Sequence, residues 1–313
     1  MRKAFIAELI KQARANKDIY LLVADVGFNL VEPFQREFPD RFVNVGIAEQ
    51  SMIGIASGLA MKGKQVFCYS LGNFPTLRCL EQIRNDVCYH NLPVTIVNSG
   101  AGLYYGTLGS SHHATEDIAV MRAMPNMTVI SPCDPSETQV LTKELCESYN
   151  KPAYLRLQSS NDFNFERDSR FYKDNIKIGE FAKIKEGHSG VCILATGSIV
   201  GEAVKAYYKH IGDESKCPTI ISVNTIKPID RDWLFGMQKS HDVILTVEEH
   251  NLSGGLGSAM LEALSDMGLN TQVIRIGLQD KFVKEVGSQE YLRKLNGLDA
   301  ESIAKRIKEV LNA

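Results

Sequence analysis

Short apolar runs alternate along the first half of the chain with longer segments whose apolar residues recur at helical spacing. The apolar runs predict strands at residues 19–24, 42–45, 66–69, 94–97 and 127–130. The longer segments predict helices at residues 2–16, 49–61, 76–89, 114–124 and 135–148. Because aliphatic strands that alternate with helices are typical of a parallel sheet covered on both faces, we expect such a sheet here.

A polar segment without a clear period, residues 161–177, interrupts this pattern and is interpreted as an inter-domain connection. Beyond it, strands are predicted at residues 191–195, 219–223, 243–247 and 273–276, and helices at residues 199–210, 258–267 and 300–311. The sequence therefore predicts an α/β fold of two domains, residues 1–160 and 178–313, each a mainly parallel sheet flanked by helices.

The composition of the chain identifies no function, but it argues against some classes of function. The chain has 35 Lys and Arg against 37 Asp and Glu, a net charge of −2, whereas general nucleic-acid or membrane-surface binding calls for a basic excess. No apolar run is long enough to span a bilayer, and the charged N-terminal segment lacks the apolar core of a signal peptide. We expect a cytoplasmic protein with no nucleic-acid or membrane partner.

Cysteines and a glycine cluster are interpreted as structural features. None of the 7 cysteines belongs to a Cys-x-x-Cys pair, which favours small buried side chains over a zinc site or a catalytic thiol, so no metal ligand is predicted. The glycines at residues 254–257 lack the order of a dinucleotide fingerprint and the Walker lysine, so tight packing is the better interpretation.

Two polar features lie next to predicted helices. Glu49 follows a predicted strand, and an acid in that place is explained, by itself, as a partner of the positive end of the helix dipole. The adjacent His112 and His113 precede the next predicted helix and cannot both point the same way from one backbone. A catalytic or substrate-binding histidine and a solvated loop that caps the helix both fit this spacing.

Several strings, taken together and in order, resemble the C-terminal half of the transketolase family. That half consists of a pyrimidine-binding domain followed by the transketolase C-terminal domain, and the resemblance covers nearly the whole chain. Each string is weak alone, and their order makes the resemblance strong. They lie at residues 46–50, 81–85, 112–119, 125–130, 132–135, 225–230 and 247–258.

The resemblance implies thiamine diphosphate as the cofactor and gives roles to individual residues. Glu49 matches the catalytic glutamate that hydrogen-bonds a ring nitrogen of the cofactor pyrimidine, and the bound cofactor stabilises the carbanion left by carbon–carbon cleavage. His112 matches a catalytic, substrate-binding histidine, with His113 as the neighbouring alternative. Leu71 and Phe74 match positions that pack on the pyrimidine ring, and Leu71 stands where the family usually has phenylalanine.

Departures from the family pattern affect the substrate. Leu108 stands in place of an aspartate that reads an acceptor hydroxyl, and Gly100 in place of a histidine that binds the substrate phosphate. Ser159 replaces an expected arginine, with Arg156 nearby, while Arg2 matches another basic, substrate-binding position. Because phosphate binding favours several cationic donors, these departures predict a small sugar acceptor that is unphosphorylated or otherwise specialised.

The family motif that holds the cofactor diphosphate and its Mg²⁺ or Ca²⁺ does not occur in this sequence. The resemblance therefore implies a partner, an N-terminal transketolase subunit that carries the diphosphate and metal site. It also implies a homodimer of this chain within an α2β2 heterotetramer. The expected reaction is the transfer of a two-carbon ketol unit from a ketose to an aldehyde. Alternatives are the beta subunit of a 2-oxoacid dehydrogenase, a deoxyxylulose-phosphate synthase-like enzyme, and a non-catalytic partner subunit.

Overall fold

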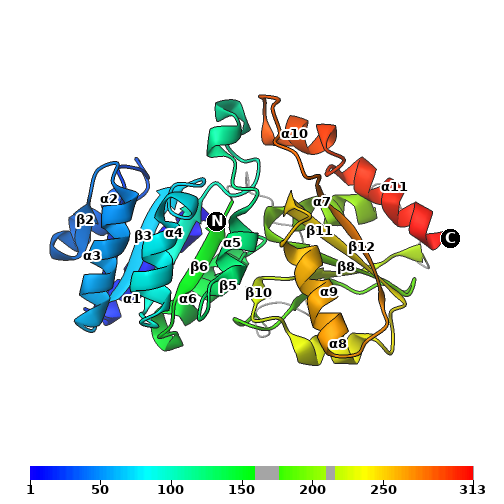
Figure 1. Ribbon diagram of the computed structural model, residues 1–313, viewed down its shortest axis with the longest axis horizontal. Coiled ribbons are helices and arrows are strands. Elements are labelled where there is room, and N and C mark those ends of the chain that lie inside the picture. The colour runs from blue at the N-terminus through cyan, green and yellow to red at the C-terminus, as the bar shows by residue number, and fades with distance from the viewer. Residues whose placement is uncertain (159–175, 209–215, 313) are drawn as a thin grey trace.

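The computed structural model describes residues 1–158, 176–208 and 216–312, and it contains two sheets that lie side by side (Figure 1). The first sheet has seven strands in the order β10-β5-β6-β4-β3-β1-β2. All its pairs are parallel except that of β10 with β5. Its strands are β1 (Ile19–Val23), β2 (Phe42–Asn44), β3 (Gln65–Leu71), β4 (Val94–Ser99), β5 (Thr128–Ile130), β6 (Ala153–Leu157) and β10 (Thr225–Lys227).

Alternate residues of the central strands enter two apolar layers, as the two-residue period of a strand requires. Leu22 and Ile96 face one core cluster, whereas Leu21 and Val97 face the other. The first cluster includes residues of α3 (Glu49–Met61), of a π-helical segment (Ile83–Cys88) and of α5 (Asp117–Ala123). The second includes residues of α1 (Arg2–Ala15), α2 (Glu32–Glu37) and α6 (Pro135–Ser148).

The second sheet has five strands in the order β12-β11-β8-β9-β7, and only the β7–β9 pair is antiparallel. Its strands are β7 (Ala182–Lys185), β8 (Val191–Thr196), β9 (Thr219–Ser222), β11 (Val243–Asn251) and β12 (Gln272–Leu278). The helices of this half are α7 (Val200–Ala206), α8 (Arg231–Met237), α9 (Leu256–Asp266), α10 (Gln289–Leu295) and α11 (Ala300–Leu311). A third apolar cluster joins α7 and α11 to β8 and β11.

The predicted fold class is confirmed: two mainly parallel sheets, each flanked by helices. The helices predicted at 49–61, 135–148 and 300–311 have the predicted bounds. The single helix predicted at 76–89 is instead a 3-10 turn (Leu77–Cys79), a short α4 (Leu80–Gln82) and the π-helical segment. The strands β6, β7 and β10 were not predicted. The expected connection at residues 161–177 lies outside the described residues, except for its last two.

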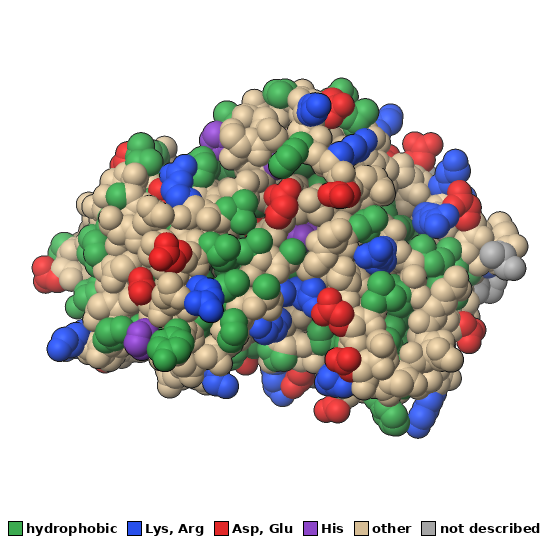
Figure 2. Space-filling view, viewed as in Figure 1, with side chains coloured by type: hydrophobic (Ala, Val, Ile, Leu, Met, Phe, Trp, Pro, Cys, Tyr) green, Lys and Arg blue, Asp and Glu red, His purple; other side chains and the backbone are tan. Residues whose placement is uncertain are grey.

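Within the described ranges, no helix is both long enough and apolar enough to cross a membrane. Acidic and basic side chains are interspersed on the face of the molecule in Figure 2, consistent with the small net charge. All 7 cysteines are buried, and burial raises the pKa of the Cys79 thiol to about 12. Since a nucleophilic or metal-binding cysteine acts as the thiolate, this environment fits a packing role.

Candidate functional site

The candidate site lies at the edge of the first sheet where parallel strands end. Because β3 and β4 run parallel, their carboxyl ends meet at one edge, and the loops that follow them lie together. The β3 loop carries Phe74, and the longer β4 loop carries His112 and His113. Glu49 begins α3, close to this edge, as the sequence predicted for an acid at a strand–helix junction.

Glu49 is only 2% exposed and is paired with an arginine that sequence reasoning missed. Arg78 Nη1 donates to Glu49 Oε2 at 2.8 Å, and the Arg78 side chain is 43% exposed. The guanidinium carbon also lies 4.3 Å from the ring centre of Phe74. A planar cation thus contacts two of the three residues that were predicted to bind the cofactor pyrimidine, Glu49 and Phe74.

His112 continues this line of contacts. Its ring meets Phe74 edge-on at 5.3 Å and Tyr105 at 6.4 Å between ring centres, and its Nδ1 lies 3.0 Å from Ser111 Oγ. Arg2 reaches the same loop, because its Nη2 donates to the hydroxyl of Tyr104 at 3.3 Å. The structure therefore brings Glu49, Phe74, His112 and Arg2 into one connected region.

Leu71 is the last residue of β3 and is half-buried at this edge, where its carbonyl accepts from the Phe74 N–H at 3.2 Å. Gly72 follows with a φ of +57°, and a side-chain carbon there would lie 2.8 Å from the carbonyl oxygen of His112. Only glycine lets the two loops approach this closely. The Phe74 and His112 loops are therefore held together by backbone packing.

His113 is more deeply buried than His112. It is 3% exposed, lines a cavity of about 200 Å³ between the two halves of the chain, and its Nε2 has no hydrogen-bond partner among the described residues. Burial lowers the pKa of His113. The two adjacent histidines, which the sequence left as alternatives, thus occupy different environments.

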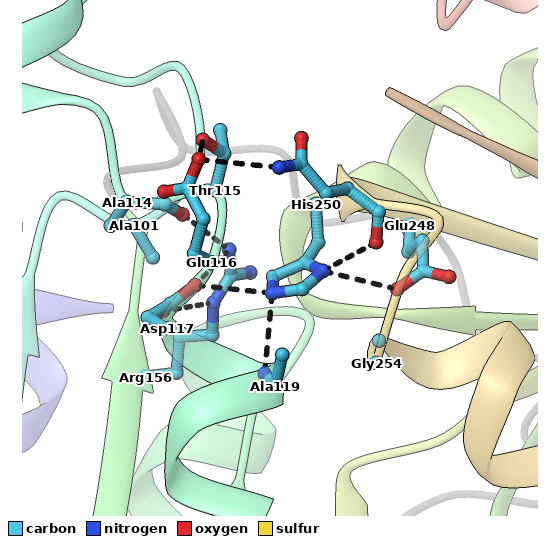
Figure 3. A network of polar contacts seen from close by, with 12 residues as sticks. Ala101, Ala114, Thr115, Glu116, Asp117, Ala119, Arg156, Glu248, His250 and Gly254 are labelled. Carbon is cyan, nitrogen blue, oxygen red and sulfur yellow. Dashed lines mark hydrogen bonds and ion pairs between the residues drawn. The ribbon is translucent and has the colours of Figure 1, made fainter. Parts of the chain in front are cut away.

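A buried network of charged side chains joins the two halves (Figure 3). Asp117 accepts from Arg156 Nε at 2.7 Å and from the Tyr154 hydroxyl at 2.6 Å, and all three residues are fully buried. Arg156 also donates to the carbonyls of Ala114 and Glu249. Arg156 is therefore engaged in this network, although its Nη1 has no hydrogen-bond partner among the described residues.

Residues 248–250, near the end of β11, contribute the side chains of this network that belong to the second half of the chain. His250 Nε2 accepts from the Ala119 N–H at 3.3 Å and Nδ1 lies 2.6 Å from the Asn251 carbonyl, so the ring is neutral, and burial lowers its pKa to about 4. Glu248 accepts from the N–H groups of Leu256 and Gly257, and burial raises its pKa to about 7.

The glycine cluster packs against this carboxylate. A side-chain carbon at Gly255 would lie 1.9 Å from Glu248 Oε2. Because Glu248 fills the start of α9, tight packing rather than phosphate binding is confirmed for residues 254–257.

Glu249 links the loop after β4, which carries His112 and His113 and is called the histidine loop below, to the second half of the chain. Its Oε1 accepts from the Leu103 N–H at 2.6 Å and from Gln289 at 2.8 Å, and its Oε2 accepts from Arg293 Nε at 2.5 Å. The loop that carries His112 therefore starts from an anchored backbone. No sequence spacing pointed to Glu249 or Arg78, because both act across long sequence separations.

Two of the positions that depart from the family pattern, Gly100 and Leu108, lie among the described residues. Gly100 has a φ of +98°, and a side-chain carbon there would collide with the Tyr105 ring at 2.0 Å, so no histidine fits this backbone. Leu108 is 54% exposed. Ser159 lies outside the described residues. Among the described residues, no cluster of three or more His, Cys, Asp or Glu side chains could hold a metal ion.

Two mainly parallel sheets, each flanked by helices, define an α/β protein of two domains. Residues 1–162 match the family described as transketolase, pyrimidine binding domain, and residues 179–303 match transketolase, C-terminal domain. The chain belongs to the transketolase family.

Relatives support this assignment, and two of them are of similar length to this chain. The chain is 40% identical over 314 residues to a protein named as a transketolase C-terminal section from Methanocaldococcus jannaschii, covering 99% of this chain and 95% of the relative. It is 33% identical over 299 residues to an apulose-4-phosphate transketolase subunit from Actinobacillus succinogenes, covering 95% and 94%. It also matches 1-deoxy-D-xylulose-5-phosphate synthase from Clostridium perfringens at 34% identity, covering 98% of this chain but 48% of that protein.

Solved structures agree on the fold. A split gene transketolase, described as an inactive beta4 tetramer, superposes with a TM-score of 0.82 at 33% identity, covering 99% of this chain and 98% of that one. A transketolase mutant from Pichia stipitis gives a TM-score of 0.79 at 21% identity and covers 99% of this chain and 45% of that one.

A transketolase pyrimidine domain implies thiamine diphosphate, and the residues present fit that group. An aminopyrimidine requires an acid for its ring nitrogen and an apolar surface for its face. Arg78 already shows that a planar nitrogen-bearing group fits between the Glu49 carboxylate and the Phe74 ring. Leu71 offers aliphatic surface at the same edge.

Proposed function

We propose that this chain is the C-terminal subunit of a thiamine diphosphate-dependent transketolase that moves a two-carbon ketol unit from a ketose to an aldehyde. The single observation that supports this most is the connected line Glu49–Arg78–Phe74–His112 at the carboxyl edge of the first sheet. The domains that carry it out would span residues 1–160 and 178–313.

Each residue has a separate task in this proposal. Glu49 shares a proton with the pyrimidine ring nitrogen from a buried position, where water does not compete. Phe74 and Leu71 pack on the ring. His112 donates to or accepts from substrate hydroxyls, with its ring placed by Phe74 and Tyr105. When bound, the cofactor supplies the electron sink for carbon–carbon cleavage.

The proposed assembly contains a second kind of polypeptide. Relatives that span nearly the same residues are named as a C-terminal section and as one subunit of a transketolase, and one such chain forms an inactive beta4 tetramer. We infer that the cofactor diphosphate is held, through Mg²⁺ or Ca²⁺, on an N-terminal transketolase subunit. Two copies of each chain would form an α2β2 assembly.

The proposed acceptor is an unphosphorylated or specialised small sugar, because Gly100 offers no cation, Arg156 is buried in an ion pair, and Leu108 lacks the carboxylate that would read an acceptor hydroxyl. Arg2 is the basic side chain that lies against the histidine loop. A deoxyxylulose-phosphate synthase-like reaction is the second candidate, since that class matches 98% of this chain.

The experiment is co-expression of the chain with an N-terminal transketolase subunit from the same organism, followed by ketol-transfer assays. We expect cofactor-dependent transfer to D-ribose that exceeds transfer to D-ribose 5-phosphate, and no transfer when either chain is assayed alone. Efficient use of ribose 5-phosphate would overturn the acceptor assignment. Condensation of pyruvate with an aldehyde, without ketol transfer, would favour the second candidate.

A further inference from the structure

We propose that Glu249, on β11 in the second half of the chain, is a positioning residue for His112 in the first half. It acts through the backbone of the histidine loop, which it holds at a fixed place relative to α10. The consequence for turnover rests on the function proposed above, whereas the contacts that hold the loop do not.

The Glu249 carboxylate collects hydrogen bonds from separate segments of the chain. It is 0% exposed, and its Oε1 accepts from the Leu103 N–H of the histidine loop at 2.6 Å. The same oxygen accepts from Gln289 of α10 at 2.8 Å and from Gln158, just after β6, at 3.3 Å. The other oxygen accepts from Arg293 of α10. Because hydrogen bonds to an ionised acceptor are stronger than neutral ones, one buried side chain fixes the start of the loop against α10.

The two ends of the histidine loop are joined, so a contact at its start also places its far end. The Gly102 N–H donates to the Ala114 carbonyl at 2.9 Å, and the Ala114 N–H donates back to the Gly102 carbonyl at 3.0 Å. Leu103 follows the first end directly, and its side chain packs in the apolar cluster of the second half. His112 lies two residues before the second end. Holding Leu103 therefore holds the base from which His112 projects.

The segment that leads into α10 makes a second contact with the same loop (Figure 1). The Gly287 N–H donates to the Gly106 carbonyl at 3.2 Å. The two segments are so close that a side-chain carbon at Gly106 would lie 2.4 Å from Leu292 Cδ1. Tyr105, whose ring lies 6.4 Å from that of His112, directly precedes Gly106. One of the two rings beside His112 is thus held by the second half of the chain.

The tip of the loop has little support of its own. Ser110 and Ser111 are exposed and His112 is half-buried, although the His112 carbonyl packs against Gly72 on one side. A side chain on such a tip is placed by the segments that hold the base of the loop. Since a misplacement of about 1 Å can cost about 10²-fold in rate, the contacts of Glu249 should be visible in turnover.

The first test is Glu249→Gln in the chain assembled with an N-terminal transketolase subunit from the same organism. An amide has one acceptor atom and one donor atom, so either the Leu103 N–H or the Arg293 guanidinium then faces another donor. We expect kcat/KM for the ketose, per folded assembly, to fall by about tenfold to 10²-fold. Thiamine diphosphate affinity, measured by calorimetry, should stay within about twofold, because Glu49 and Phe74 make no contact with Glu249. Unchanged kcat/KM would overturn the proposal.

Gly106→Ala tests the same role without leaving a charge unpaired, in case Glu249→Gln does not fold. Gly106 has no positive φ, so alanine fits its backbone and the new methyl group pushes the loop away from Leu292. We expect the same separation, a lower kcat/KM with an unchanged cofactor affinity. Gly236→Ala on α8 is the matched control, because a side-chain carbon there would meet nothing within 4 Å, and it should retain activity.

Arg122→Met controls for general loosening between the two halves. Arg122 donates to the Gly254 carbonyl at 2.7 Å and pairs with Glu262 at 2.6 Å, so it too crosses between the halves. It lies on α5, outside the histidine loop. We expect kcat/KM to remain unchanged in this variant. A loss equal to that of Glu249→Gln would overturn the proposal, since any contact between the halves would then have the same effect.

Amide hydrogen exchange of the full chain gives a readout that needs no turnover. In Glu249→Gln and Gly106→Ala, exchange in residues 103–113 should become roughly tenfold faster, the worth of one hydrogen bond, while exchange in β4 stays unchanged. Faster exchange in both segments would indicate global destabilisation and overturn the positioning role.

The positioning role and the proposed reaction can fail separately. Faster exchange confined to residues 103–113, in an assembly without ketol transfer, would retain the hold of Glu249 on the loop and reject the reaction. Ketol transfer with unchanged kcat/KM in both Glu249→Gln and Gly106→Ala would retain the reaction and reject the positioning role.

Discussion

The site at the sheet edge and the network between the two halves both pair a carboxylate with an arginine, but they do so in opposite environments. Asp117 and Arg156 are both 0% exposed, and each has further hydrogen bonds to neighbouring groups. Glu49 is buried as well, yet its partner Arg78 is 43% exposed. The buried Asp117–Arg156 pair lies within the first half and contacts the second through the bond from Arg156 to the Glu249 carbonyl, whereas the side chain of Arg78 is partly open to solvent.

Because of this difference in exposure, substitutions in the buried pair should mainly affect stability, whereas substitutions at the sheet edge should mainly affect activity. A buried pair contributes little net stability when intact, but removing one partner leaves an uncompensated charge in a medium that cannot solvate it. At the sheet edge, the same loss is moderated because Arg78 has access to water. Substitutions at the two places should therefore have different readouts.

The largest effect is expected for Glu49→Gln, which keeps the shape of the side chain but removes its exchangeable proton. Ketol transfer by the assembled enzyme should fall by about 10²–10⁴-fold, the usual contribution of a positioned acid or base. The thermal midpoint should change little. Glu8→Gln is the matched control, since Glu8 is also 2% exposed but lies on α1, and it should retain activity. Activity of Glu49→Gln within threefold of the control would remove Glu49 from the mechanism.

The next largest effect is expected for Asp117→Asn, which leaves the Arg156 charge buried without its counter-ion. We expect the free energy of unfolding to fall by about 3–5 kcal/mol, measured by urea denaturation. Glu309→Gln tests the comparison, because its pair with Arg306 is about half exposed and should contribute less than about 1 kcal/mol. Equal losses in the two variants would contradict the distinction between the buried network and exposed pairs.

A smaller effect concerns pH. Burial lowers the pKa of His250 from 6.5 to about 4. Between pH 6.5 and pH 4 the imidazole is therefore protonated in the unfolded chain but neutral in the folded chain. Stability is therefore present above pH 6.5 and lost as the pH falls towards 4, by up to about 3 kcal/mol. His250→Gln should flatten this part of the profile in equilibrium denaturation.

The pKa shift of Glu248 is opposite in direction to that of His250, so a variant at Glu248 provides an internal check on the pH profile. Its pKa is raised from 4.5 to about 7, so its contribution is present below pH 4.5 and lost as the pH rises through 7. Glu248→Gln should remove that loss, and the two variants should change the slope of stability with pH in opposite directions. Slopes that match the unsubstituted chain in both variants would show that neither group titrates as its burial implies.

The sequence predicted the helices that begin at recognisable capping residues, because those residues act on backbone groups only a few positions away. The helix at 135–148 begins with a proline after Asp134, whose side chain accepts from the Glu137 N–H, and both features are readable from sequence. Strand β10 was missed because its three residues pair with β5 from the other half of the chain. The π-helical segment was missed because its apolar residues fit an ordinary helix as well.

The residues of the candidate site also fall into two groups, those that the sequence identified and those that only the structure revealed. Resemblance to the family pointed to Glu49, Phe74 and His112, which the structure brings together. Arg78 and Glu249 could not be found, because their roles depend on contacts made across 29 and 146 positions of the chain. Whether His112 or His113 faces Phe74 also required the backbone geometry of the loop, since spacing alone treats adjacent residues alike.

The smallest effect, and the finest test of the comparison, concerns Arg78 itself. Its guanidinium contacts both Glu49 and Phe74, which are two of the three side chains that the cofactor pyrimidine is proposed to use. Arg78→Met should therefore tighten thiamine diphosphate binding by up to about fivefold, the worth of a partly exposed ion pair, as measured by calorimetry on the assembled enzyme. Arg14→Met removes the exposed pair with Glu37 and should leave the affinity unchanged. Weaker binding in Arg78→Met would show that Arg78 stays beside Glu49 and positions it, which would make the two arginine–carboxylate pairs alike after all.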